Sequence, residues 1–388
     1  MLLSLCSCVA LLHAAATRAA TVADVQALLD QLHAKKDDAI AKELSQMQMT
    51  ERVSSGQLAK WNADFTGTKT RQALMLLADE SAFLELPAQG IPAAAAPDLD
   101  AQRAIMSLAV DYVHQALPRI PNFYATRATV RFVDTPPETG RHASDKTEER
   151  KMRYLDEARV TVLVRDGKEL VDPGKSKNAP TAVNDSGMST TGVFGVVLGR
   201  VILDAAHGRE TWGHWENASD GRRAVFDYAV PQAQSHYEVE WCCAVTDGFE
   251  FEPFRKQSSY HGEIAIDPES GAIRRMTMVA DLDPGDPLVR SSIAVEYAPV
   301  EIGGRRYICP VRSVSITVGE IVILGRDQQP PDEKHKRPLE TSLNDVVFDD
   351  YHLFRSESRI LTGAESPPAE APGAPGSGSA EPAAKPQM

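Results

Sequence analysis

The chain has 388 residues, a formal net charge of −13 and a pI near 5.3, and 43% of its residues are hydrophobic. The hydrophobic fraction is ordinary for a globular protein with a sizeable core, and the length allows one large or two modest domains. An acidic chain has no surplus of positive charge to neutralise phosphates, so the composition argues against a nucleic-acid partner.

Residues 1–20 have the pattern of a signal peptide. Leu2–Leu12 is an apolar run too short for a membrane span, and small residues follow it, although no Lys or Arg precedes it. An A-x-A cleavage pattern ends at Ala16, and a weaker pattern ends at Ala19. The segment predicts an exported protein, periplasmic or secreted. No other run reaches the length of a membrane span, so we expect no transmembrane anchor in the mature chain.

Residues 21–125 are predicted to form a helical segment. Apolar residues recur at helical spacing in three stretches, near residues 22–32, 70–86 and 105–116. Thr21 is the candidate N-cap of the first helix, and either Asp98 or Asp100 can cap the third. Prolines follow the second and third stretches and should end those helices.

Residues 126–361 alternate between apolar and polar with a period of two, which predicts an antiparallel sheet with one dry face and one wet face. Ile264 and Ile266, for example, share one parity, and Glu263 takes the other. Residues 158–171 have the pattern of a hairpin. The fold class predicted for the chain is α+β: a curved antiparallel sheet, or half-barrel, that encloses a helix and follows the helical segment.

The enclosed helix is expected at residues 192–208, which are apolar almost all round and too short to span a membrane. Gly195 and Gly199 have no side chain and should allow another backbone to approach the helix closely. Their spacing matches neither the dinucleotide fingerprint nor a phosphate loop, so we interpret them as packing residues. The residues expected to line any ligand cavity, or else to pack in the core, are Phe194, Val197, Leu198, Val201 and Ile202.

Three cysteines follow the predicted signal peptide, Cys242, Cys243 and Cys309. An oxidising compartment favours one disulfide and one spare thiol. Parity places Cys243 and Cys309 on the apolar face, so these two are the candidate pair. Their bridge requires the sheet to roll nearly closed, or the strand order to differ from the sequence order.

The last part of the chain, residues 362–388, consists largely of Pro, Ala, Gly, Ser and Glu. Such a composition has little to bury and predicts a disordered tail. The expected organisation is therefore a signal peptide (1–20), a helical segment (21–125), a β half-barrel (126–361) and this tail.

The sequence shows no motif for catalysis or for metal binding. H-E-x-x-H and C-x-x-C are absent. His207 and His214 are interpreted as separate surface histidines rather than as metal ligands. Ser235 and His236 are adjacent at a predicted strand start and so point to opposite faces, which disfavours a catalytic pair. We therefore expect a non-catalytic protein without a cofactor or a metal.

Turn-and-strand patterns in the second half of the chain resemble a known family. One is a D-x-x-(S/T)-G-x-I hairpin formed by Asp267, Ser270, Gly271 and Ile273. A second pattern is formed by Tyr297, Val300, Gly303, Tyr307 and Pro310, and a closing strand carries Phe348, Tyr351 and Phe354. In these features the chain resembles periplasmic lipoprotein-carrier and sigma-regulator proteins of the LolA, LppX and RseB kind. The whole chain also resembles exported proteins of acidobacterial type.

The resemblance implies an incompletely closed antiparallel half-barrel wrapped round helices. The apolar hollow of such a scaffold predicts an exported cell-envelope protein that binds a lipid or an acylated peptide. The alternative hypothesis is a protein-interaction or structural component of the envelope, in which the helical segment docks a partner and no small molecule binds. The expected partners are accordingly a lipid or lipoprotein, or an envelope protein.

Overall fold

The computed structural model describes residues 17–134, 151–165, 168–171, 196–205, 207–218, 220–245, 251–320 and 339–354. All of them belong to one unit of the chain, Met1–Phe354. Most of the predicted signal peptide and the whole predicted tail lie outside the described residues.

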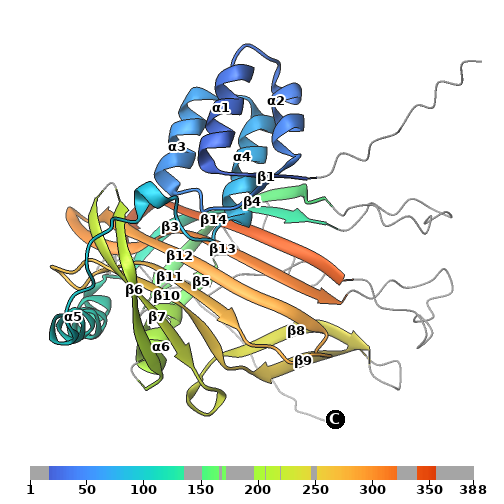
Figure 1. Cartoon of the computed structure of the whole chain (residues 1–388). Helices are drawn as coiled ribbons and strands as arrows, with labels where there is room; N and C mark the ends of the chain where they lie inside the picture. The colour runs from blue at the N-terminus through green and yellow to red at the C-terminus, as the bar shows by residue number, and fades with distance from the viewer. Residues whose placement is uncertain are drawn as a thin grey trace, which may run out of the picture. The chain divides into compact units, whose positions relative to one another are not determined.

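Residues 18–80 form a small helical bundle with a short two-stranded sheet, here called the bundle (Figure 1). Its elements are β1 (Arg18–Ala20), α1 (Val22–Leu32), α2 (Asp37–Leu44), β2 (Met47–Met49), α3 (Ser55–Asp64) and α4 (Thr68–Glu80). Thr21 caps α1 as predicted and forms a capping box with Asp24. Trp61 is fully buried in an apolar core that these elements build among themselves.

Two features of the bundle differ from the expectation. Helices α2 and α3 are not predicted, because helices of eight and ten residues contain too few turns to give a clear period. Strand β1 lies within the predicted signal peptide and pairs in parallel with β2. Ala20 is 1% exposed, so β1 contributes to the core of the bundle. Cleavage after Ala16 would retain this strand, whereas cleavage after Ala19 would remove most of it.

A connector leads from the bundle to the main sheet. It contains the short helix η1 (Ala88–Gly90), the long helix α5 (Leu99–Ala116) and η2 (Leu117–Arg119). Asp98 caps α5, since its Oδ1 accepts the backbone N–H of Ala101 at 2.8 Å. In the described part of the chain, no helix is long and apolar enough to cross a membrane.

The main sheet has ten antiparallel strands in the order β5-β4-β3-β14-β13-β12-β11-β10-β7-β6. Their bounds are β3 (Phe123–Val133), β4 (Arg153–Arg165), β5 (Lys168–Val171), β6 (Arg209–Ala218), β7 (Gly221–Val230), β10 (Tyr260–Ile266), β11 (Ile273–Ala280), β12 (Leu288–Ile302), β13 (Arg305–Glu320) and β14 (Leu339–Leu353). The remaining elements are α6 (Val196–Ala205), η3 (Gln232–Gln234) and a separate hairpin of β8 (Glu238–Val245) with β9 (Phe251–Gln257). The predicted α+β class and antiparallel sheet are confirmed. Within the described residues the edge strands β5 and β6 do not pair with each other, so the sheet is open.

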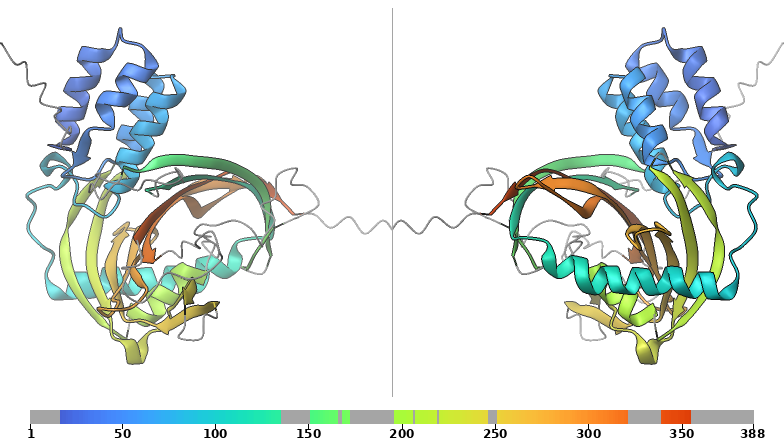
Figure 2. Two further views of the ribbon diagram at one scale, coloured as in Figure 1. Left: turned by 90° about the vertical axis from the view of Figure 1, so that its right-hand side faces the viewer. Right: turned by 90° about the vertical axis from the view of Figure 1, so that its left-hand side faces the viewer.

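Both faces of the sheet carry apolar residues. Helices α5 and α6 pack on one face, here called the α5/α6 face, whose buried residues include Phe226, Ile264, Ile266, Met276 and Val295. Helix α4 and the turn after it pack on the other, here called the bundle face, whose buried residues are Phe132, Ala294, Val314, Ile316 and Leu343. Figure 2 shows the sheet curved, with α5 and α6 on one side of it and the bundle on the other.

The bundle face is the predicted wet face, and the expectation that water covers it is wrong. Glu263 pairs there with Arg275 at 2.8 Å and lies 4.0 Å from Arg52 of the bundle. Arg52 also pairs with Glu216 at 2.7 Å, and both of these side chains are buried. Alternation in a strand predicts which side a residue faces, but it does not predict what covers that side.

Candidate functional site

Helix α5 covers the α5/α6 face with a narrow stripe of contact. Of its 18 residues, Ile105, Ala109 and Val113 are buried, and three more apolar residues are partly buried against the same core. They lie four apart, so they follow one side of the helix. Leu99 and Leu108 are 66% and 40% exposed. Six of its 18 side chains therefore hold α5 on this face.

The backbone of α5 rests on the turn between β10 and β11. Asp267 shapes this turn, because its Oδ1 accepts two backbone N–H groups, at 3.0 and 3.2 Å. Gly271 completes the turn with a φ of 71°. A Cβ at Gly271 would overlap the carbonyl group of Leu108 and lie 2.9 Å from the backbone nitrogen of Ala109. The turn therefore needs glycine both for its own conformation and for the contact with α5.

The residues predicted to line a cavity lie on α6 or just before it. Val201 and Ile202 are 1% and 2% exposed and belong to the core of the α5/α6 face. Val197 and Leu198 lie on α6, but their side chains are outside the described residues, as is the whole of Phe194. The described part of α6 therefore acts as core packing between the sheet and α5.

Gly199 does not provide the close helix packing that its spacing suggested. Among the described residues, a Cβ at this position would meet no atom within 4 Å, so the expectation is wrong for Gly199 there. Gly195 lies outside the described residues. The contact is made instead by the branched side chains of Val201 and Ile202 and by Ala205.

A buried carboxylate fixes the end of α6 to the sheet. Asp204 is 2% exposed and accepts a hydrogen bond from the Tyr260 hydroxyl of β10 at 2.8 Å. It also accepts the backbone N–H of His236 at 2.9 Å, and His236 Nδ1 lies 2.6 Å from Asp204 Oδ1. Three donors compensate for the loss of water around this carboxylate. The network joins α6, the loop before β8 and β10.

This arrangement does not form a catalytic triad. Ser235 Oγ accepts the backbone N–H of Tyr237 at 3.0 Å, while the ring of His236 faces Asp204. The His236 side chain is 74% exposed, so no shaped pocket surrounds it. Within the described ranges, no group of three His, Cys, Asp or Glu side chains is placed to hold a metal ion.

Tyrosines occupy the α5/α6 face beside Asp204. The ring centroids of Tyr228 and Tyr237 lie 5.9 and 5.7 Å from that of Tyr260. The Tyr228 hydroxyl donates to the Thr277 carbonyl at 2.7 Å, and burial raises the pKa of Tyr228 well above its ordinary value. The hydroxyl of Tyr297 is buried on the same face, and among the described residues it has no hydrogen-bond partner. Such a surface is apolar with a few hydrogen-bonding groups, as binding sites for lipids usually are.

The predicted disulfide between Cys243 and Cys309 is wrong. Cys309 is a free and fully buried thiol on β13, and burial raises its pKa to about 12. Hairpin β8–β9 does not belong to the main sheet, and Trp241 of β8 donates from Nε1 to the carbonyl of Glu320 at 3.0 Å. Glu320 and Cys309 lie at opposite ends of β13, about 35 Å apart at roughly 3.3 Å per residue. Cys243 is two residues from Trp241 and so lies far from Cys309.

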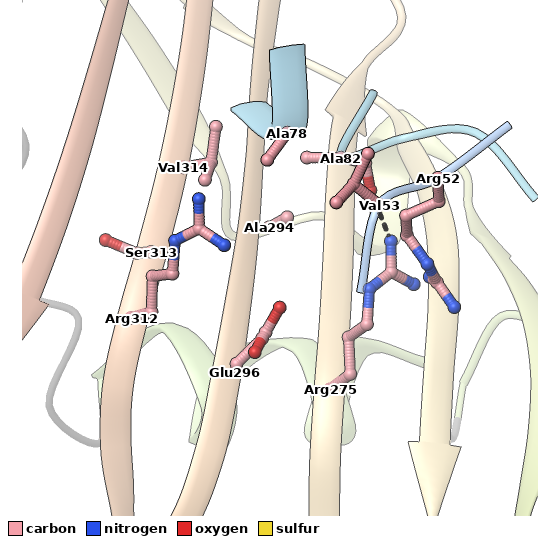
Figure 3. A pocket seen from close by; sticks show the side chains of 10 residues that line it. All are labelled: Arg52, Val53, Ala78, Ala82, Arg275, Ala294, Glu296, Arg312, Ser313 and Val314. Carbon is pink, nitrogen blue, oxygen red and sulfur yellow. Dashed lines mark hydrogen bonds between the residues drawn. The ribbon is translucent and has the colours of Figure 1, made fainter. Parts of the chain in front are cut away.

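A small cavity with a mixed polar and apolar lining lies between the bundle and the bundle face (Figure 3). Arg52 of the bundle and Arg275, Glu296 and Arg312 of three neighbouring strands line it. Its volume is about 20 Å³, which is room for about one water molecule. This cavity is therefore too small for an acyl chain.

Two parts of the site are not predicted from the sequence. A single acidic residue in an apolar helix is a signal that could have indicated the Asp204 network, because a buried carboxylate requires donors. The contact between Gly271 and α5 has no local signal, since the two segments are more than 150 residues apart.

A scan against protein-family models gives no match, and a search of the curated proteins gives none either. The function is therefore inferred from the residues and their geometry.

Proposed function

We propose that this protein is an exported, non-catalytic protein of the cell envelope that binds a lipid or an acylated peptide on the α5/α6 face. In this proposal the curved sheet is a half-barrel, α6 is the enclosed helix and α5 is a removable cover. The proposal depends on one observation: α5 covers an apolar face of the sheet and contacts it only along one narrow side of the helix. Tyr297, whose hydroxyl has no hydrogen-bond partner among the described residues, offers a hydrogen bond to the polar end of an acyl chain.

The energetics favour exchange of α5 for an acyl chain. Burial of the side chains of Ile105, Ala109 and Val113 contributes on the order of 5 kcal/mol, and the partly buried Met106, Val110 and Tyr112 add about half as much again. Each buried CH₂ group of an acyl chain contributes about 0.8 kcal/mol, so a chain of about 14 carbons contributes on the order of 10 kcal/mol. A long acyl chain can therefore displace α5, whereas a chain of a few carbons cannot.

Export is supported by the sequence pattern of residues 1–20, and the position of β1 is compatible with cleavage after Ala16. Cleavage after Ala16 leaves β1 available to pair with β2. In the described part of the site, His236 and Asp204 hold α6 rather than activating a nucleophile, which supports a binding role over a catalytic one.

Native mass spectrometry of the full chain, purified from the envelope fraction of its own cells, tests the proposal. We expect the protein to carry an additional mass that matches a lipid or an acylated peptide. This mass should be lost when an excess of long-chain fatty acid competes for the α5/α6 face. A protein without bound lipid that carries a stoichiometric protein partner would instead favour the interaction or structural role.

A further inference from the structure

Buried charges hold the bundle on the sheet. Arg312 of β13 donates from Nη2 to Asp79 Oδ1 of α4 at 2.5 Å and to Asp345 Oδ2 of β14 at 3.0 Å. Asp79 and Asp345 are 0% and 2% exposed. Two carboxyl groups from different parts of the chain therefore share one nitrogen of a single guanidinium group, which brings them close together.

The second oxygen of each carboxyl group needs a donor. Within the described structure, Asp79 Oδ2 and Asp345 Oδ1 are buried and have no hydrogen-bond partner. A proton shared between the two groups would supply this donor and remove one of two adjacent negative charges. Burial raises the pKa of Asp79 well above its ordinary value of 3.8; Asp345 raises it further, and Arg312 lowers it.

The charges around the pair agree with a bound proton. In the described structure, the guanidinium groups of Arg52, Arg275 and Arg312 face the carboxyl groups of Asp79, Asp345, Glu216, Glu263 and Glu296. Arg290 of β12 adds a fourth guanidinium group, 5.2 Å from the ring centroid of Phe83 in the turn after α4, and Glu80, next to Asp79, adds a sixth carboxyl group whose pKa burial raises to about 7. With every carboxyl group ionised, this buried interface would hold an excess of negative charge. Arg312 faces the pair from β13; Glu296 from β12 and Ser55 from α3 lie on the other side of Arg312, and the Ser55 hydroxyl donates to Glu296 at 2.5 Å.

We propose that docking of the bundle on the sheet takes up one proton, held between Asp79 and Asp345, so that rising pH releases the bundle. The bundle has its own apolar core, which lets it leave the sheet as a folded unit. Its departure would expose Arg275, Glu296 and Arg312, which lie directly opposite one another on β11, β12 and β13 (Figure 3). This control acts on the bundle face and is separate from ligand binding on the α5/α6 face.

Proton linkage fixes the direction of the effect. A carboxyl group whose pKa is higher in the docked state stabilises docking fully below its ordinary pKa of 3.8. That stabilisation is lost as the pH rises through the raised pKa of Asp79. One proton changes the docking equilibrium about tenfold per pH unit within this window.

Thiol labelling of the full chain measures release of the bundle. The variant Ala294→Cys places a thiol on the bundle face, where the native side chain is 5% exposed. The other cysteines are replaced by serine, except Cys309, which is buried on the α5/α6 face and reports opening there. A dithiodipyridine reagent reacts with thiols down to acid pH, and each rate is divided by that of a free cysteine peptide at the same pH.

We expect the corrected labelling rate of Ala294→Cys to rise about tenfold per pH unit from about pH 4 upward, while Cys309 stays unlabelled. Adding Asp79→Asn, a neutral group of the same shape, should remove the slope, and Asp345→Asn should do the same. Asp38→Asn, which breaks an exposed ion pair of the bundle, should leave the slope unchanged.

Three results would overturn the proposal. The labelling rate of Ala294→Cys could be independent of pH in the parent chain. The slope could survive in whichever of the Asp79→Asn and Asp345→Asn variants folds. Cys309 could become labelled in step with Ala294→Cys, which would mean general unfolding rather than release of the bundle.

Discussion

Gly271 and Leu108 are in direct backbone contact, although they are 163 positions apart in the chain. A Cβ at Gly271 would occupy the space of the Leu108 carbonyl group. Gly271 also has a φ of 71°, which a side chain disfavours. The turn of the β10–β11 hairpin thus sets how closely α5 approaches the sheet.

The variant Gly271→Ala should loosen α5. Backbone strain and overlap with α5 act together, and overlap in a packed interface costs typically about 1–3 kcal/mol. Gly304→Ala is the matched control, because Gly304 has a similar φ of 81° but, in the described part of the chain, no atom within 4 Å of the added Cβ. Hydrogen exchange of the α5 amides should be at least about fivefold faster in Gly271→Ala than in Gly304→Ala. Equal exchange in both variants would show that the contact does not hold α5.

The variant Ile202→Ala should destabilise the protein by about 2–5 kcal/mol, because it leaves a cavity in a packed core. The neighbouring Leu203 is 48% exposed, so Leu203→Ala should change the free energy of unfolding by less than about 0.5 kcal/mol. Denaturant unfolding followed by tyrosine and tryptophan fluorescence measures both values. If the two substitutions cost the same, α6 is not packed as described.

The variant Asp204→Asn should lower the free energy of unfolding by about 2–4 kcal/mol. An asparagine keeps the shape but loses the charge, and its NH₂ group would face the donors of Tyr260 and His236. Asp30→Asn is the control, because Asp30 accepts an exposed hydrogen bond from Gln26 on α1. A loss of similar size in both variants would contradict the role given to Asp204.

Cys309 should resist alkylation in the folded protein. Burial both blocks access and raises the pKa of this thiol to about 12, so the reactive thiolate is scarce at neutral pH. Peptide mapping after iodoacetamide treatment should find Cys309 unmodified in the native protein and modified after denaturation. A peptide that links Cys243 to Cys309 would reinstate the disulfide that the structure lacks.

Local signals in the sequence predicted individual elements well. The apolar spacing and the cap at Asp98 indicated α5, and alternation indicated the strands and the side that Ile264 and Ile266 face. The predicted hairpin of residues 158–171 corresponds to β4 and β5, with Arg165 opposite Lys168. These features depend on residues close together in the chain, so a short window of sequence contains the information.

Long-range relationships were not accessible in this way. Strand β14 inserts between β13 and β3, and no local pattern specifies that order. Glu263 has the parity of a solvated residue, yet Arg52 reaches it from more than 200 positions away. The Asp204 network likewise joins three separate segments through Tyr260 and His236. Periodicity indicates which side of the sheet a residue faces. The segment that packs against it on that side is known only from the fold.

In the proposed function, the α5/α6 face exchanges α5 for an acyl chain. The most direct measurement is a titration of the delipidated full chain with a naturally fluorescent polyene fatty acid. We expect saturable binding of about one molecule per chain, competed by long-chain and not by short-chain fatty acids. Binding should be tighter in Gly271→Ala than in Gly304→Ala, because a loosened cover raises the population of the open state. Absence of binding to the parent chain and to Gly271→Ala alike would contradict the claim.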